Sequence, residues 1–299
     1  RLHVHAGALM EQDPEQGLAH YLEHMAFNGT EHFAAAEMVK YFQRLGMAFG
    51  ADTNAYTGFD RTVYQLELPE GREELIDDGL LLLRDYAGRM NLATEQIESE
   101  RGVILSEMRE RDTASFRLFQ ERLRFVLPDA LFHRRMPIGV EETVRAVGRE
   151  EFAAFYTHWY RPSRITVVAV GNVDPTTMAA QIERHFADMP EPERPAPDPA
   201  LGTVDPDSVQ AQYVVEAEAP AVTVALETVH PYTLGPDSLD LRIHQFRRHV
   251  AHEIISRRLD ILAEAEHTVF SAGQACAYDW QGFVTRAALD LTCRPADWQ

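Results

Sequence analysis

The sequence predicts an α+β fold, and three observations carry this prediction. Residues Thr62–Leu68 alternate apolar and polar side chains up to Pro69, which is typical of a strand. A second expected strand, Ala51–Thr57, comes just before it and follows two helical segments, so strands adjoin one another. The order strand, helix, strand then returns near the end of the chain. Adjacent strands of this kind favour α+β over a repeating βαβ arrangement.

The remaining elements before residue 190 follow from apolar periodicity and from helix boundary residues. Thr94 is expected to be the N-cap of a helix that runs on toward Arg124. The β-branched run Ile165–Val170 predicts a buried strand. The other expected elements are a strand at Leu2–Leu9 and helices at Gly17–Asn28, Ala34–Leu45, Arg72–Met90, Arg149–Trp159 and Pro175–Phe186.

A proline-rich stretch divides the chain. Five prolines fall within residues 189–199, so this stretch is expected to be a linker or an edge loop. We therefore expect a first domain at residues 1–205 and a second domain at residues 206–299. In the second domain we expect a helix at Asp240–Ala265 and strands at Gln212–Glu216, Ala221–Glu227, Phe270–Tyr278 and Val284–Cys293.

The composition is that of a globular protein. The chain has 299 residues, 45% hydrophobic and 25% charged, which is enough for two domains of ordinary size. Its formal net charge of -19 argues against binding to nucleic acid or to an anionic membrane surface. The charge favours basic or neutral peptides as partners, with solubility as the simpler explanation.

Other features bear on the compartment. No run of eighteen apolar residues occurs, so we predict no transmembrane helix, and no signal peptide is visible. Because the chain begins at Arg1 within a strand pattern, we interpret it as a trimmed piece of a longer protein. The two cysteines, Cys276 and Cys293, are too few for a disulfide scaffold. We expect core thiols, and pairing across neighbouring strands stays open.

Residues 20–24 form the pattern His-x-x-Glu-His, which indicates a metal site. On a helix, His20 and His24 lie four residues apart and share one face, where two imidazoles can hold one metal ion. Glu23 lies beside that face and could take a proton from a metal-activated water. The pattern is the inverzincin signature. It is short, and two surface histidines on a helix are the simpler alternative.

A catalytic zinc usually has three protein ligands, so a third ligand is needed. The helix expected after Thr94 offers Glu100 and Glu107, which are seven residues apart, about two turns, and share a face. One of them could bind the metal while the other orients a ligand histidine. Their spacing leaves the choice between them open. Glu95 and Glu98 of the same segment are expected to be solvated.

Together, four segments resemble the pitrilysin (M16) family of zinc metallopeptidases, which includes insulin-degrading enzyme and the mitochondrial processing peptidase. Phe-Asn-Gly-Thr follows the motif at residues 27–30, and Glu100 and Glu107 stand in the pattern Glu-Arg-x-Val-Ile-x-x-Glu. The other two segments are residues 50–64 and Tyr-Arg-Pro at residues 160–162. All four occur in the family's order, and the sequence is most like that of its large bacterial members.

The resemblance implies a fold and a set of residue roles. The fold would be two consecutive α/β-sandwich units of the pitrilysin and processing-peptidase type, with antiparallel-rich sheets and helices packed on one face. The second unit would be incomplete and would hold no metal. Carried onto this sequence, the family's pattern makes His20, His24 and Glu107 the Zn2+ ligands, Glu23 the general base and Glu100 the carboxylate that supports a ligand.

The resemblance also implies how a peptide substrate binds. Asn54 and Ala55 would belong to an edge strand that pairs with the substrate backbone, and Phe27 would contact the substrate as well. Main-chain pairing would allow cleavage of peptides and small unfolded proteins of varied sequence. In the family the zinc half closes against a later, C-terminal half that this chain lacks. We therefore expect the fragment to bind zinc and to be weakly active or inactive alone.

Several alternatives stay open beside a zinc endopeptidase. A catalytically silent partner or binding subunit on the same fold would lack one of the histidines, the motif glutamate or the third ligand. All four of these residues are present here. Hydrolysis of a non-peptide substrate would need a closed pocket, which the edge-strand resemblance disfavours. Exported relatives imply a periplasmic or secreted location, with the cytoplasm as the alternative. A homodimer also stays open.

A second histidine pattern occurs at residues 249–253 and reads His-x-x-His-Glu. His249 and His252 are three residues apart on an expected helix, so a metal is conceivable. However, no pair of glutamates follows them, and arginines surround the pattern. We therefore expect no second metal site there.

Overall fold

The structure is a computed structural model that describes residues 1–35, 37–44, 46–48, 50, 53–191 and 197–298. Leu45, the first two residues of the strand expected at Ala51–Thr57, and part of the proline-rich stretch lie outside the described residues. The chain forms two compact units. Unit 1 comprises residues 1–111 and 134–201, and unit 2 comprises residues 112–133 and 202–299. This division differs from a simple boundary at residue 205 because residues 112–133 pack with unit 2.

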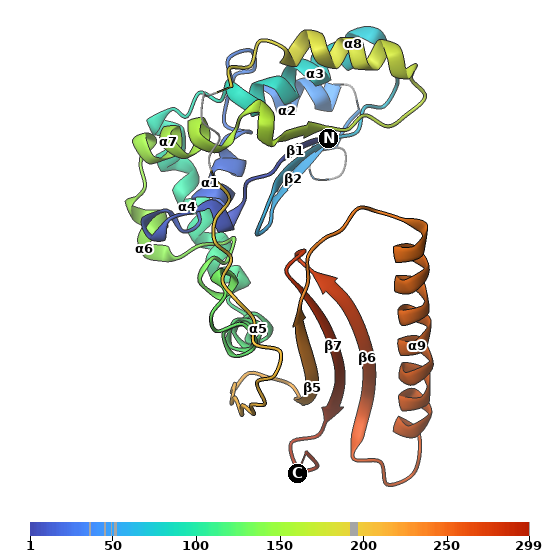
Figure 1. Cartoon of the computed structure of the whole chain (residues 1–299). Helices are drawn as coiled ribbons and strands as arrows, with labels where there is room; N and C mark the ends of the chain where they lie inside the picture. Colours follow the sequence, from blue (N-terminus) through green and yellow to red (C-terminus); the bar gives the residue numbers. More distant parts are fainter. Residues whose placement is uncertain (36, 45, 49, 51–52, 192–196, 299) are drawn as a thin grey trace. The chain divides into compact units, whose positions relative to one another are not determined.

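Unit 1 is built on a four-stranded antiparallel sheet (Figure 1). Its strands are β1 (Leu2–Val4), β2 (Thr53–Thr57), β3 (Thr62–Leu66) and β4 (Ile165–Val167). They lie in the order β2-β3-β1-β4, so β2 and β4 are the edge strands. The α+β prediction and the antiparallel sheet are thereby confirmed.

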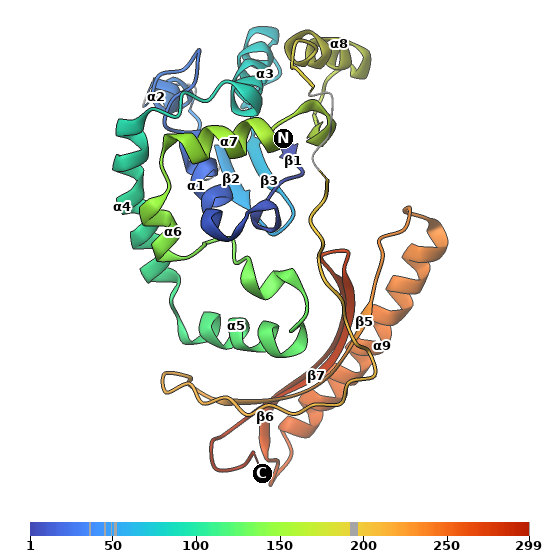
Figure 2. The same ribbon diagram turned by 60° about the vertical axis from the view of Figure 1, so that its left-hand side comes forward.

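Seven α-helices belong to the described part of unit 1, and Figure 2 shows them from a second direction. They are α1 (Leu18–Met25), α2 (Glu37–Arg44), α3 (Glu73–Gly88), α4 (Thr94–Arg111), α6 (Glu141–Ala146), α7 (Arg149–Trp159) and α8 (Pro175–Phe186). Helices α1 and α3 contact the strands of the sheet. Short 3-10 turns lie at Ala8–Met10, Asp13–Glu15 and Pro162–Arg164, and a fourth, at Leu131–Arg134, joins the two units.

Tyr21 fixes α1 within the core of unit 1. Its ring is fully buried and packs edge-on against Phe152 of α7, with ring centroids 4.8 Å apart. Its hydroxyl donates a hydrogen bond to the carbonyl oxygen of Ile97 in α4. Because α1 carries the histidine motif and α4 carries the two glutamates, this buried contact holds the two halves of the site together.

Two boundary predictions around α4 are wrong. Thr94 is the first residue of α4, and the preceding Ala93 carbonyl accepts the first helical hydrogen bond, from Ile97. The helix also ends at Arg111 instead of continuing toward Arg124. A new helix, α5 (Ala114–Val126), begins after Thr113, whose hydroxyl accepts the N–H of Phe116. The N-cap at Thr113 therefore starts a second helix in a segment where periodicity predicted a single continuous helix.

Three strand predictions also need correction. The strand expected at Leu2–Leu9 ends at Val4, and Ala8–Met10 is a 3-10 turn. The strand expected at Ile165–Val170 is shorter and less buried than predicted. It ends at Val167 on the edge of the sheet, none of its three residues is fully buried, and Val170 is 93% exposed. The residues Gln212–Glu216 form no strand. There the side chain of Glu216 pairs with Arg117, and Tyr213 and Val215 are exposed.

Unit 2 contains a three-stranded antiparallel sheet in the order β5-β7-β6. The strands are β5 (Val222–Pro231), β6 (Phe270–Trp280) and β7 (Val284–Cys293), and α9 (Leu239–Ala263) packs on β6. The expected order of strand, helix and two strands is confirmed. Both cysteines are free: Cys276 lies opposite Ala288, whereas Cys293 lies opposite Phe270 at the other end of the hairpin.

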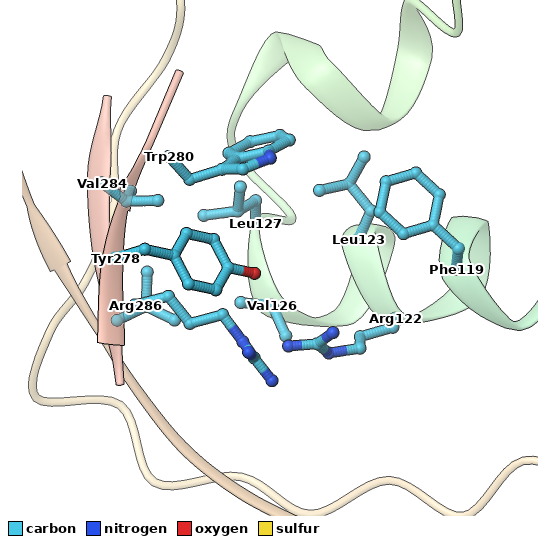
Figure 3. A pocket seen from close by; sticks show the side chains of 10 residues that line it. Phe119, Arg122, Leu123, Val126, Leu127, Tyr278, Trp280, Val284 and Arg286 are labelled. Carbon is cyan, nitrogen blue, oxygen red and sulfur yellow. The ribbon is translucent and has the colours of Figure 1, made fainter. Parts of the chain in front are cut away.

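Helix α5 packs against this sheet around an apolar pocket (Figure 3). Phe119, Leu123 and Leu127 on the helix side face Tyr278 and Trp280 of β6. Two arginines at the pocket, Arg122 and Arg286, both pair with Glu227. The pocket therefore offers apolar contact and guanidinium groups that already have an acidic partner.

Among the described residues, no helix combines the length and the hydrophobicity that crossing a bilayer requires.

Candidate metal centre

The motif helix α1 begins at a glycine that the local geometry requires. Gly17 is the N-cap and has a φ of 96°, in the left-handed region that favours glycine. A Cβ atom there would also lie 3.0 Å from the Cα of Gly139. These restraints place the first turn of α1, and with it the histidines that follow.

A buried carboxylate, Glu11, completes the start of this helix. It accepts hydrogen bonds from the N–H groups of Gly17, at 3.0 Å, and Ala19, at 2.8 Å. Its backbone carbonyl accepts a hydrogen bond from Nε of Arg135, at 2.9 Å. Burial raises the pKa of Glu11 to about 8, although the two N–H donors and Arg135 act in the opposite direction. Sequence reasoning missed Glu11 because it lies in the preceding loop, outside any periodic pattern.

Replacing this cap should destabilise unit 1. Glu11→Ala leaves two buried N–H groups without their acceptor, so we expect the free energy of unfolding to fall by about 1–3 kcal/mol. Urea unfolding followed by the fluorescence of Trp159 measures this in unit 1 alone, in a Trp280→Phe, Trp298→Phe background that removes the two tryptophans of unit 2. An unchanged midpoint would contradict the capping role.

The same assay also tests how the free energy of unfolding of unit 1 changes with pH. The folded pKa of Glu11, about 8, is higher than its ordinary value of 4.5. The folded state therefore binds the extra proton, and the stability that Glu11 contributes falls as the pH rises from about 4.5 to about 8. Glu11→Gln cannot ionise. The difference in unfolding free energy between wild type and Glu11→Gln should shrink or reverse over this pH range.

The structure brings His20, His24 and Glu107 together. Their ligand atoms all lie within 4.8 Å of one another, the only such trio of potential ligands among the described residues. Nε2 of His20 and Nε2 of His24 each lie 3.5 Å from the same carboxylate oxygen, Oε2 of Glu107. The other oxygen of Glu107 pairs with Arg111 at 2.6 Å. One oxygen of Glu107 is thus directed at both imidazoles.

These separations fit a zinc ion. Zn–N and Zn–O bonds of about 2.0–2.1 Å in a tetrahedron place neighbouring ligand atoms roughly 3.3–3.4 Å apart. The two separations of 3.5 Å from Oε2 of Glu107 come close to that edge, and all three ligand atoms lie within 4.8 Å of one another. Two imidazoles and a carboxylate are also the donor set of known catalytic zinc sites, with a fourth position left for water or substrate. His20, His24 and Glu107 therefore have both the spacing and the chemistry to hold zinc.

Glu100 lies behind His24 and not beside Glu107. Its Oε1 accepts a hydrogen bond from Nδ1 of His24 at 2.9 Å. This bond leaves Nε2 of His24 directed toward Glu107. The position of Glu100 is that of a residue that orients a ligand histidine.

Glu23 is not one of the three potential ligands. Its side chain is 7% exposed, and its Oε2 accepts a hydrogen bond of 2.6 Å from the hydroxyl of Thr57, the last residue of β2. Burial raises the pKa of Glu23, against the lowering effect of this hydrogen bond. Thr57 was not among the predicted site residues, because its contact with Glu23 depends on how β2 meets α1.

The pKa values of the two histidines shift in opposite directions. Burial, followed by the neighbouring His24, lowers the pKa of His20. Burial acts on His24 in the same direction, but the contacts with Glu100 and Glu107 outweigh it and raise the pKa of His24 to about 9. Contact with His24 lowers the pKa of Glu107 in turn.

The predicted substrate-binding residues lie on two elements near the site. Asn54 and Ala55 belong to the edge strand β2, where the N–H of Ala55 donates to Oδ1 of Asn54 at 2.9 Å. Phe27 follows α1 and packs edge-on against Tyr86, with centroids 5.7 Å apart. Thr57 links the end of β2 to Glu23, so the edge strand reaches the candidate centre.

Comparison with known proteins agrees with this fold. The model of the family "Insulinase (Peptidase family M16)" matches residues 1–133, and the model "Peptidase M16 inactive domain" matches residues 146–267. These two matches take in most of the chain. The chain therefore belongs to the M16 family, and the relatives that it matches are named zinc proteases.

Individual relatives are similar over part of their length. "Probable zinc protease PqqL" of Escherichia coli is 34% identical over 189 residues, 63% of this chain and 20% of that protein. "Zinc protease PQQL-like" of Arabidopsis thaliana is 29% identical over 231 residues, 77% of this chain and 24% of that protein. The chain thus spans a fifth to a quarter of the length of these relatives.

A solved structure matches nearly the whole chain. The first half of the periplasmic protease PqqL from Escherichia coli superposes with a TM-score of 0.86 and 27% identity, covering 98% of this chain and 62% of that one. The predicted fold type and family are thereby confirmed.

Proposed function

We propose that this chain is the zinc-binding part of a zinc-dependent endopeptidase. The observation that carries the proposal is that Nε2 of His20 and Nε2 of His24 each lie 3.5 Å from Oε2 of Glu107, close to the edge length of a zinc tetrahedron. Glu23 lies beside them and is no part of the trio. A peptidase of this kind needs both a metal site with an open position and a carboxylate that is free to move protons.

Each residue has a defined task in this proposal. His20, His24 and Glu107 hold the metal, and Glu100 fixes the ring of His24. When bound, zinc supplies a Lewis acid that acidifies water and polarises a peptide carbonyl. Glu23 accepts the proton of the attacking water and passes it to the leaving amine. The hydroxyl of Thr57 donates to Oε2 of Glu23 and helps to hold this carboxylate in place.

The edge strand β2 supports a peptide as the substrate. A strand at a sheet edge can pair with an extended peptide through main-chain hydrogen bonds, which require no particular sequence. The N–H of Ala55 is one donor for such pairing once the side chain of Asn54 moves off it. Because β2 ends at Thr57, a peptide paired along it would lead toward Glu23 and the metal.

The length of the relatives supports a role for further chain in catalysis. The 299 residues cover only part of each of them, so we propose that a C-terminal half completes the substrate site. The chain alone would then bind zinc and cleave peptides slowly or not at all. The similar Escherichia coli protein is a periplasmic protease, which supports a periplasmic location for this protein also.

A catalytically silent partner subunit is the second candidate. It would keep the fold and lose the chemistry. The presence of all three potential ligands and of Glu23 favours the enzyme.

Metal removal tests the proposal. We expect about one zinc per chain by elemental analysis after purification without chelator. We expect 1,10-phenanthroline to remove this zinc and to stop the cleavage of a mixed peptide library by the longest natural form of the protein. Restored zinc should restore cleavage. If the chain takes up no zinc even from added metal, the partner-subunit function becomes the better account.

A further inference from the structure

Asn28 lies in the turn that follows α1, and its side-chain amide makes two hydrogen bonds. Nδ2 donates to the backbone carbonyl of His24 at 3.1 Å and to Oε2 of Glu100 at 3.0 Å. An amide nitrogen has two protons, so both are used. The side chain therefore joins the backbone of one motif histidine to a glutamate that is 72 residues away in the sequence.

These bonds close a ring of contacts around His24. Oε1 of Glu100 accepts from Nδ1 of His24, and Oε2 of Glu100 accepts from Asn28, which in turn is tied to the backbone of His24. The imidazole of His24 is thus held relative to its own main chain. Without Asn28, Oε2 of Glu100 would lose this partner, and the carboxylate could rotate away from Nδ1.

We propose that Asn28 is a positioning residue for the metal centre, acting through Glu100 to hold Nε2 of His24 in line with Glu107. This inference rests on the proposed function, because it takes His24 as a metal ligand. It adds a third layer behind the ligand and the carboxylate that supports it. Asn28 also distinguishes the two glutamates of α4. It donates to Glu100, which lies at Nδ1 of His24, whereas Glu107 lies at Nε2 of the same ring.

Zinc affinity measures this role without any assay of cleavage. The dissociation constant for zinc is determined by competition with a chromophoric chelator, in wild type, Asn28→Leu, Glu100→Ala and the double variant. Leucine has a similar shape and no donor. Loss of an outer partner of a ligand typically weakens metal binding by about 10–100-fold, so we expect about 10-fold for Asn28→Leu and more for Glu100→Ala.

The double variant decides whether Asn28 acts through Glu100. If it does, the double variant binds zinc no more weakly than Glu100→Ala alone, because the amide has nothing left to hold. The proposal would be overturned if the loss of zinc affinity in the double variant equalled the product of the losses in the two single variants. It would also be overturned if Asn28→Leu bound zinc with wild-type affinity. Asn28→Ala repeats the test if the leucine variant does not fold.

A matched control separates this role from the stiffness of the turn. Asn91 also donates through Nδ2 to the segment after α1, but its acceptor is the carbonyl of Thr30, 2.7 Å away, and not Glu100. Asn91→Leu should leave the zinc affinity unchanged. Equal weakening by Asn91→Leu would show that the turn alone matters. If wild type itself binds no zinc, the proposed function fails before Asn28 is tested.

Discussion

Glu23→Gln is expected to lower the rate of peptide cleavage by about 10²–10⁴-fold, the usual contribution of a general acid–base group, and to leave the zinc content unchanged. The amide matches the carboxylate in shape, and its oxygen can still accept the hydroxyl of Thr57. However, it cannot take a proton from water. Zinc should stay bound because Glu23 lies outside the trio formed by His20, His24 and Glu107.

The assay compares cleavage per bound zinc in the longest natural form of the protein. Glu95→Gln is the matched control, because Glu95 is an exposed carboxylate in the first turn of α4. Its variant should cleave like wild type. Should Glu23→Gln retain the wild-type rate at full zinc occupancy, another group must move the proton. Loss of zinc together with activity would instead assign Glu23 to the metal.

Much of the candidate site was predictable because it depends on the helical repeat. The spacing of His20 and His24 fixes a shared face wherever that segment is a helix, and the structure places it in α1. The same holds for Glu100 and Glu107 on α4. What spacing could not decide is which glutamate faces the imidazoles from the metal side. That choice depends on how α1 and α4 pack, which the family resemblance supplied.

The contacts that support the site were not predictable from local pattern. Glu11 caps α1 from a preceding loop, Thr57 reaches Glu23 from β2, and Asn28 bridges to Glu100 across the core. Each contact joins segments that meet only in the folded chain. The same reason explains the error at Gln212–Glu216, where an apolar pattern suits a strand but no neighbouring strand pairs with it among the described residues. Periodicity describes what a segment can form, and tertiary contacts decide what it does form.

Glu107→Ala should remove zinc from the chain, which is the second large effect we expect. The variant deletes one of three converging ligand atoms, whereas Glu100→Ala deletes only the carboxylate behind His24. A supporting residue typically contributes about 10–100-fold to metal affinity. We therefore expect about 10–100-fold weaker zinc binding in Glu100→Ala and a larger loss in Glu107→Ala, with little zinc left after gel filtration.

The comparison is informative because both glutamates lie on α4 and neither change should unfold it. Removing Glu107 frees Arg111, whose side chain is 53% exposed, so water can solvate it at little cost. Unchanged far-ultraviolet circular dichroism of the metal-free variants would verify this. If instead Glu100→Ala lost the zinc and Glu107→Ala kept it, the two glutamates would exchange roles. Nε2 of His24 would then have to turn away from Glu107, against the 3.5 Å separation that both imidazoles share with its Oε2.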